Sequence, residues 1–196
     1  MQQENFSPQD SLQLIQNMID KTKDDMGDNA IHFLLWGWTI FAACVGQFVL
    51  KNVFGFEKHY LVWWIIIPTM IAAVIIGLRQ DKKQRISTYV GDSMKYLWTG
   101  MGISFFILAV ILTRKPWDIT AFPVYMLLYG TGTFISGQVL KFKPLTYGGL
   151  IAWAMAIAAA FSNADYQLLF GAGSILASYI VPAYLLRSKM NKKTNS

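Results

Sequence analysis

The stretch AIHFLLWGWTIFAACVGQFVL, from Ala30 to Leu50, contains no Asp, Glu, Lys or Arg. A helix rises about 1.5 Å per residue, so about 20 apolar residues cross a hydrocarbon core roughly 30 Å thick. A charged side chain at the centre of such a helix would cost about 2.5–3.5 kcal/mol on insertion scales. The stretch therefore predicts a helix that spans a membrane.

Five further stretches, each 18 to 22 residues long, are equally free of charged side chains. They run from Tyr60 to Leu78, Tyr96 to Thr113, Ile119 to Leu140, Leu145 to Ser162 and Tyr166 to Leu186. Soluble helices of this length would need a charged outer face. We therefore expect an all-α fold with six transmembrane helices in one domain (residues 30–186), preceded by a separate segment (1–29) and followed by a basic tail (187–196).

The Lys and Arg residues lie unevenly on the two sides of such a bundle. The side that holds both termini carries 13 of them, in the N-terminal segment (Lys21, Lys23), the second loop (Arg79, Lys82, Lys83, Arg85, Lys95), the fourth loop (Lys141, Lys143) and the tail (Arg187, Lys189, Lys192, Lys193). The other side carries four, Lys51, Lys58, Arg114 and Lys115. Positive loops favour the cytoplasm, so both termini are expected there. Topology also explains the net charge of +6 without a nucleic-acid partner.

The segment before the first span has the pattern of an amphipathic helix from Ser7 to Met26, with Gly27 as its C-cap. Leu12, Ile15 and Ile19 fall on one face of this helix. An anionic leaflet is a poor sole anchor, because aspartates outnumber lysines in its second half. Two interpretations stay open: the face docks on the basic loops of its own bundle, or it binds a partner protein or a second copy.

The second loop carries four basic residues within seven positions: Arg79, Lys82, Lys83 and Arg85. Such a cluster is typical of a topology signal beside lipid headgroups. The alternative is a specific site for anionic lipid at the same residues.

The first and fourth spans share a pattern. Leu34 to Gly37 followed by Phe41 parallels Leu127 to Gly130 followed by Phe134. A three-plus-three duplication would place the halves in opposite orientations, as in many transporters, with both glycines facing the other half. The alternative is coincidence between two spans rich in Leu and Gly.

Two features predict how the spans bend and pack. Pro68 and Pro182 lie within apolar stretches and should each interrupt the helical hydrogen bonding. Gly148, Ala152 and Ala156 recur every four residues in the fifth span, a spacing that lets helices approach closely. We therefore expect this span at the packed centre of the bundle.

The spans offer little chemistry. His32 and His59 belong to opposite ends of the bundle, and no hydrolase, zinc or phosphate-binding motif occurs, so we expect neither an enzyme nor a metal or cofactor. Hydroxyl side chains near the midplane are the remaining polar groups: Thr39, Thr69, Ser104, Thr131, Thr133 and Ser174. They are candidates for the path of a small neutral solute. The alternative is that they bond carbonyls of their own or neighbouring helices.

Three segments, FSPQDSLQLIQNMI (residues 6–19), FLLWGW (33–38) and GTFISGQVLKFKPL (132–145), together with YQLL (166–169), resemble a group of small six-span bacterial membrane proteins without assigned activity. The resemblance implies a location in the bacterial cytoplasmic (inner) membrane and transfers no site residue. The sequence therefore favours a non-catalytic membrane protein, structural or regulatory, that meets a partner through its cytoplasmic helix and loops. A channel or transporter for a small neutral or apolar solute is the alternative.

The charge distribution generates a test of topology. Alkaline phosphatase fused after Ser196 should be inactive, because it would remain in the cytoplasm, whereas a fusion after Trp117 should be active. Phosphatase activity of intact cells measures both. Activity in the reverse order, or at both positions, would contradict six spans with cytoplasmic termini.

Overall fold

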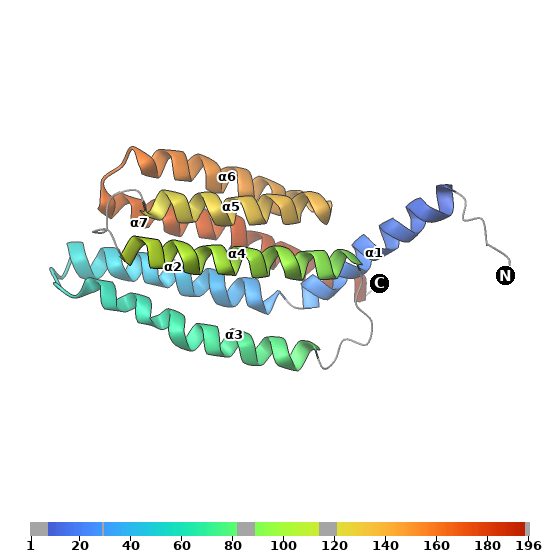
Figure 1. The fold of residues 1–196 in the computed structure, drawn as a ribbon, viewed down its shortest axis with the longest axis horizontal. Helices are drawn as coiled ribbons and strands as arrows, with labels where there is room; N and C mark the ends of the chain where they lie inside the picture. Colours follow the sequence, from blue (N-terminus) through green and yellow to red (C-terminus); the bar gives the residue numbers. More distant parts are fainter. Residues whose placement is uncertain (1–7, 29, 82–88, 114–120, 195–196) are drawn as a thin grey trace.

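The computed structural model describes residues 8–28, 30–81, 89–113 and 121–194, and over these ranges it consists of helices and short connections, without strands (Figure 1). The elements are α1 (Pro8–Asp28), α2 (Ile31–Asn52), the 3-10 segment η1 (His59–Ile65), α3 (Ile66–Asp81), α4 (Tyr89–Thr113), α5 (Ala121–Val139), α6 (Lys143–Ala160), α7 (Ala164–Ile175), the π-helical turn η2 (Leu176–Ile180) and α8 (Val181–Thr194). The all-α class expected from the sequence is confirmed.

Within the described residues, four segments are long and apolar enough to cross a membrane: Ile31–Asn52, His59–Arg79, Tyr89–Leu112 and Ala164–Ser188. The helices α5 and α6, which the sequence also predicts as spans, are not among these four. Glycines, threonines and tyrosines dilute α5, and α6 begins with Lys143 and Pro144. The composition of the helices thus indicates a membrane protein, and the spanning role of α5 and α6 stays a prediction.

Several helices extend beyond the apolar stretches. The first helix passes through Gly27 and ends at Asp28, so the expected C-cap at Gly27 is wrong, and Ser7 lies outside the described residues. The fourth helix begins at Tyr89, well before Tyr96, and α8 continues into the basic tail to Thr194. Hydropathy marks the part of a helix that suits lipid, whereas polar residues continue the same helix into water.

The helices α2 to α8 lie lengthwise in one bundle, and both chain termini lie at the same end (Figure 1). We name this the terminal end; it holds α1, the start of α4 and the end of α8. The opposite end, the far end, holds the connections between α2 and η1 and between α6 and α7. Termini at one end are what an even number of passes requires.

The centre of the bundle depends on close contact between backbones. A Cβ placed on Gly137 of α5 would collide with the backbone of Thr146 in α6, and one on Gly149 would lie 2.7 Å from the backbone N of Phe134. A Cβ on Gly148 would lie 2.8 Å from Cα of Ser178 in η2. Ala152 and Ala156 are buried in the same core. The prediction that the fifth span forms the packed centre is confirmed.

The periphery is apolar and uncovered. The most apolar window of α4 contains no buried residue, and few residues of the η1–α3 segment are buried. Large side chains such as Trp64, Ile71 and Phe106 are exposed. Contiguous apolar surface of this kind is rare on soluble monomers and matches the hydrocarbon interior of a membrane.

The two glycines of the suspected repeat have different surroundings. A Cβ on Gly37 would meet Ile180 at 2.8 Å, across the boundary between the halves, whereas one on Gly130 would meet Trp153 and Ala152, within its own half. The expectation that Gly130 faces the other half is therefore wrong. In addition, α6 packs along α7 and η2, while α3 and α4 share no extensive contact among the described residues. Packing gives the three-plus-three repeat no support.

Both prolines lie where the helix geometry changes. Pro68 lies in the first turn of α3, directly after η1, where the amide of Ile66 bonds the carbonyl of Trp63 in the 3-10 pattern. Pro182 follows η2, where the amide of Val181 bonds the carbonyl of Leu176, five residues back. Each proline lacks a donor, and the chain adjusts by tightening or widening one turn. The prolines thus coincide with a 3-10 segment and a π-helical turn, and neither type of turn was predicted from the sequence.

The glycine contacts generate a test of stability. Gly137→Ala should lower the thermal midpoint of the purified protein, because overpacking a backbone contact costs about 1–3 kcal/mol. Gly77→Ala in α3 is the matched control, since nothing lies within 4 Å of its Cβ position. Equal midpoints for the two variants would contradict the close α5–α6 contact.

Candidate functional site

Two of the six midplane hydroxyls form a contact between helices. The hydroxyl oxygens of Thr39 (α2) and Thr69 (α3) lie 3.0 Å apart, and both residues are buried. The Thr69 hydroxyl donates to the carbonyl of Ile65 at 2.8 Å, so its hydrogen is already used. Thr39 must therefore donate to Thr69. This bond joins the first two predicted spans beside the turn at Pro68.

The other four hydroxyls do not join this pair. Ser104, Thr131 and Thr133 each donate to a carbonyl four residues earlier in their own helix. Ser174 is fully buried. Among the described residues, hydrogen bonds thus connect two of the six members of the predicted solute path, and three members follow the alternative of bonding to their own helix.

Tyr179, in the π-helical turn η2, is the hub of an aromatic cluster. Its ring centroid lies 5.6 Å from that of Phe33 (α2), 5.8 Å from Trp98 (α4) and 5.9 Å from Tyr129 (α5). Gly37 lets α2 approach this turn closely. Within the part of the chain that the structure describes, the indole N–H of Trp98 is buried without a hydrogen-bond partner. The cluster thus joins α2, α4, α5 and η2 through ring contacts, with polar atoms inside an apolar core.

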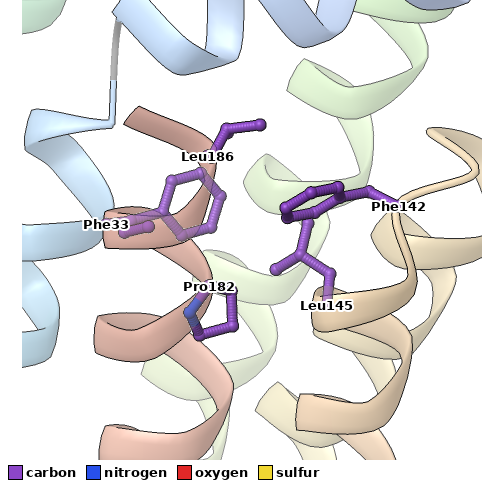
Figure 2. Close-up of a pocket in the computed structure, with 6 residues that line it drawn as sticks. Phe33, Phe142, Leu145, Pro182 and Leu186 are labelled. Carbon is purple, nitrogen blue, oxygen red and sulfur yellow. The ribbon is translucent and has the colours of Figure 1, made fainter. Parts of the chain in front are cut away.

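A small pocket opens near this cluster, toward the terminal end (Figure 2). Its lining is apolar throughout and consists of Phe33, Phe142, Leu145, Pro182, Ala183 and Leu186. Its cavity volume of about 10 Å³ has room for at most about one water molecule. None of the six candidate hydroxyls lines it. This pocket therefore offers no polar route for a solute.

A polar network occupies the far end. The side-chain amide of Gln47 (α2) lies 3.0 Å from Nδ1 of His59, and its oxygen accepts a hydrogen bond of 2.5 Å from the indole N–H of Trp63. Beside it, Lys51 at the end of α2 forms an ion pair with Asp165 at the start of α7. These contacts tie the ends of three segments together.

At the terminal end, the apolar face of α1 is divided. Ile19 is 5% exposed, and this part of α1 packs against α8 and α4. Leu12 and Ile15, on the same face, are 68% and 51% exposed. The Lys141 ammonium donates to the Gln16 side-chain oxygen at 3.4 Å, near the limit of a hydrogen bond. The bundle therefore covers one end of the predicted partner face and leaves the other end uncovered.

Of the four basic residues predicted to contact anionic lipid, the structure describes one, Arg79. Arg79 is exposed in the last turn of α3, where it would reach headgroups. Lys82, Lys83 and Arg85 lie outside the described residues. Over the ranges that the structure describes, no group of three or more His, Cys, Asp or Glu side chains could hold a metal ion. The single cysteine, Cys44, is a buried thiol in α2.

Comparison of the chain with protein-family models, with curated proteins and with solved structures gives no match. The resemblance to small six-span bacterial proteins therefore stays a prediction, and the function must be inferred from the surfaces themselves.

Two arrangements could not be derived from the sequence. The hub role of Tyr179 depends on the π-helical turn, whose only sequence signal is Pro182 three residues later. The bonding of Gln47 to His59 and Trp63 depends on how the chain reverses between α2 and η1. A glutamine within a predicted span is a signal of a hydrogen-bonded site, although it does not name the partner.

The threonine contact generates a test. Thr39→Val keeps the side-chain shape and removes a bond between helices, so it should destabilise the protein by about 0.5–1.5 kcal/mol. Ser104→Ala is the control, because that hydroxyl bonds its own helix, and its thermal midpoint should match the wild type. A midpoint for Thr39→Val equal to that of Ser104→Ala would rule out a stabilising contact at this site.

Proposed function

We propose that this chain is a six-span protein of the bacterial cytoplasmic membrane with both termini in the cytoplasm. Support for the additional spans α5 and α6 comes from their position alongside the four strongly apolar segments (Figure 1) and from their lack of charged residues apart from Lys143 at the start of α6. Support for the orientation comes from the excess of Lys and Arg at the terminal end.

The proposed activity is non-catalytic: the protein binds a cytoplasmic protein partner through α1. The observation that carries this proposal is the exposure of Leu12 and Ile15. They lie on the same face of α1 as Ile19, which is buried. In Figure 1, α1 extends beyond the ends of the bundle helices. Apolar residues at helical spacing in water are the usual anchors of a helix that binds in a groove.

The docked half of α1 gives this surface a fixed position. Ile19 packs into the bundle, and Gln16 contacts Lys141, so the exposed half is presented by an anchored helix. An anchored helix loses less conformational entropy on binding than a disordered segment. The arrangement suits an adaptor whose spans position a binding helix at the membrane surface.

A photo-reactive residue tests the proposal directly. Placed at position 15 in intact cells, it should form a discrete protein adduct upon irradiation. The matched control is position 13, which is exposed on a different face of α1. Absence of an adduct at position 15, or the same adduct at both positions, would overturn the proposed interface.

Substitutions separate binding from folding. The double variant Leu12→Asp, Ile15→Asp should keep the wild-type thermal midpoint, because both side chains are exposed. Leu12→Asp alone should weaken the adduct that a photo-reactive residue at position 15 forms. Ile19→Asp should lower the midpoint, since an unpaired buried charge costs about 2–5 kcal/mol. A large loss of stability in the double variant would show that this face serves the fold.

A further inference from the structure

The network at the far end has a fixed direction of hydrogen bonding. The indole N–H of Trp63 is a donor only, so the atom of Gln47 that faces it must be the side-chain oxygen. The amide NH₂ of Gln47 then faces His59, and both of its hydrogens are donors. Consequently Nδ1 of His59 must accept, and the imidazole must be neutral with its hydrogen on Nε2.

We propose that His59 is a proton-sensitive latch that holds η1 against α2. An imidazolium carries hydrogens on both ring nitrogens, so Nδ1–H would face the N–H donors of Gln47. Rotating the Gln47 amide would offer its oxygen to His59 but would turn its NH₂ toward the indole N–H of Trp63. Neither orientation of Gln47 satisfies a charged His59 and Trp63 together. Protonation therefore breaks one of the two bonds.

The charged groups around His59 leave this conflict in place. On α2, the ammonium of Lys51 is paired with the carboxylate of Asp165 on α7. In the connection before η1, Glu57 and Lys58 are exposed to solvent, where their opposite charges are screened. On η1, the ring of Tyr60 lies 6.2 Å from the imidazole, edge to face.

The latch matters because the second span has few other attachments. The α3 helix packs chiefly against α2 and η1, and few residues of the η1–α3 segment are buried. Trp63 also contacts Phe122 of α5, with ring centroids 5.8 Å apart, so its release would loosen a second helix. Acid should therefore detach the outer part of this span from the bundle. In the topology proposed above, the latch faces the compartment outside the cytoplasm.

Thermal unfolding of the purified full-length protein at pH 7.5 and pH 5.5 tests the latch. The wild-type midpoint should fall by about 2–4 °C at pH 5.5, the scale expected for one hydrogen bond in a chain of this size. His59→Gln should remove this difference, because an amide does not titrate. His32→Gln, at the terminal end, is the control and should keep it.

A second variant should reverse the sign of the difference between the thermal midpoints at pH 5.5 and pH 7.5. Gln47→Glu places two acceptor oxygens between Trp63 and His59, which satisfies the indole and favours the imidazolium. Its midpoint should be higher at pH 5.5 than at pH 7.5. A wild-type midpoint independent of pH, a difference that persists in His59→Gln, or no reversal in Gln47→Glu would each overturn the proposal.

Hydrogen exchange provides a readout on the unmodified protein, independent of how the variants fold. After correction for intrinsic rates, amides of residues 47–65 should lose protection at pH 5.5, whereas amides of α5 and α6 should keep it. Unchanged protection of residues 47–65, or equal loss throughout the bundle, would overturn a local latch.

Discussion

Backbone contact between α5 and α6 is the constraint on which the rest of the bundle depends. In lipid, helices gain no hydrophobic free energy from meeting, so dispersion between closely approaching backbones must hold them together. Gly137 and Gly149 permit that approach, and Gly148 extends it to η2. The helices α7 and α4 and the aromatic cluster of Tyr179 pack against this pair. The helices α3 and α4, whose most apolar windows bury few residues or none, lie at the edge.

Much of this arrangement follows from residue patterns. Charge-free stretches locate the helices, and four-residue spacing of Gly and Ala identifies a helix that packs closely against its neighbours, because both features reflect local rules of solvation and packing. The suspected repeat predicted the same surroundings for Gly37 and Gly130, which the structure does not show. Those surroundings depend on which helices meet and not on the residues next to each glycine. The sequence also could not predict that Ile19 is buried while Leu12, on the same face of α1, is exposed. This difference depends on where the bundle ends relative to a helix that crosses its edge.

Polar side chains within the bundle fall into two groups. Most serine and threonine hydroxyls bond the preceding turn of their own helix, which satisfies them without specifying a neighbour. Thr39 and Gln47, both on α2, instead bond residues of the second span, at Thr69 and at His59 and Trp63. Polar contacts thus attach η1 and α3, a segment with few buried residues, to α2.

The π-helical turn has a consequence for the two halves of the last long helix. One extra residue in a turn advances every following side chain by about 100° around the axis. Both α7 and α8 contact α2 and α6, and α8 in addition contacts α1. A regular helix would carry one stripe along its whole length. The extra residue of η2 therefore changes which side chains of α8 meet these neighbours, and among those buried are Ala183 and Leu186.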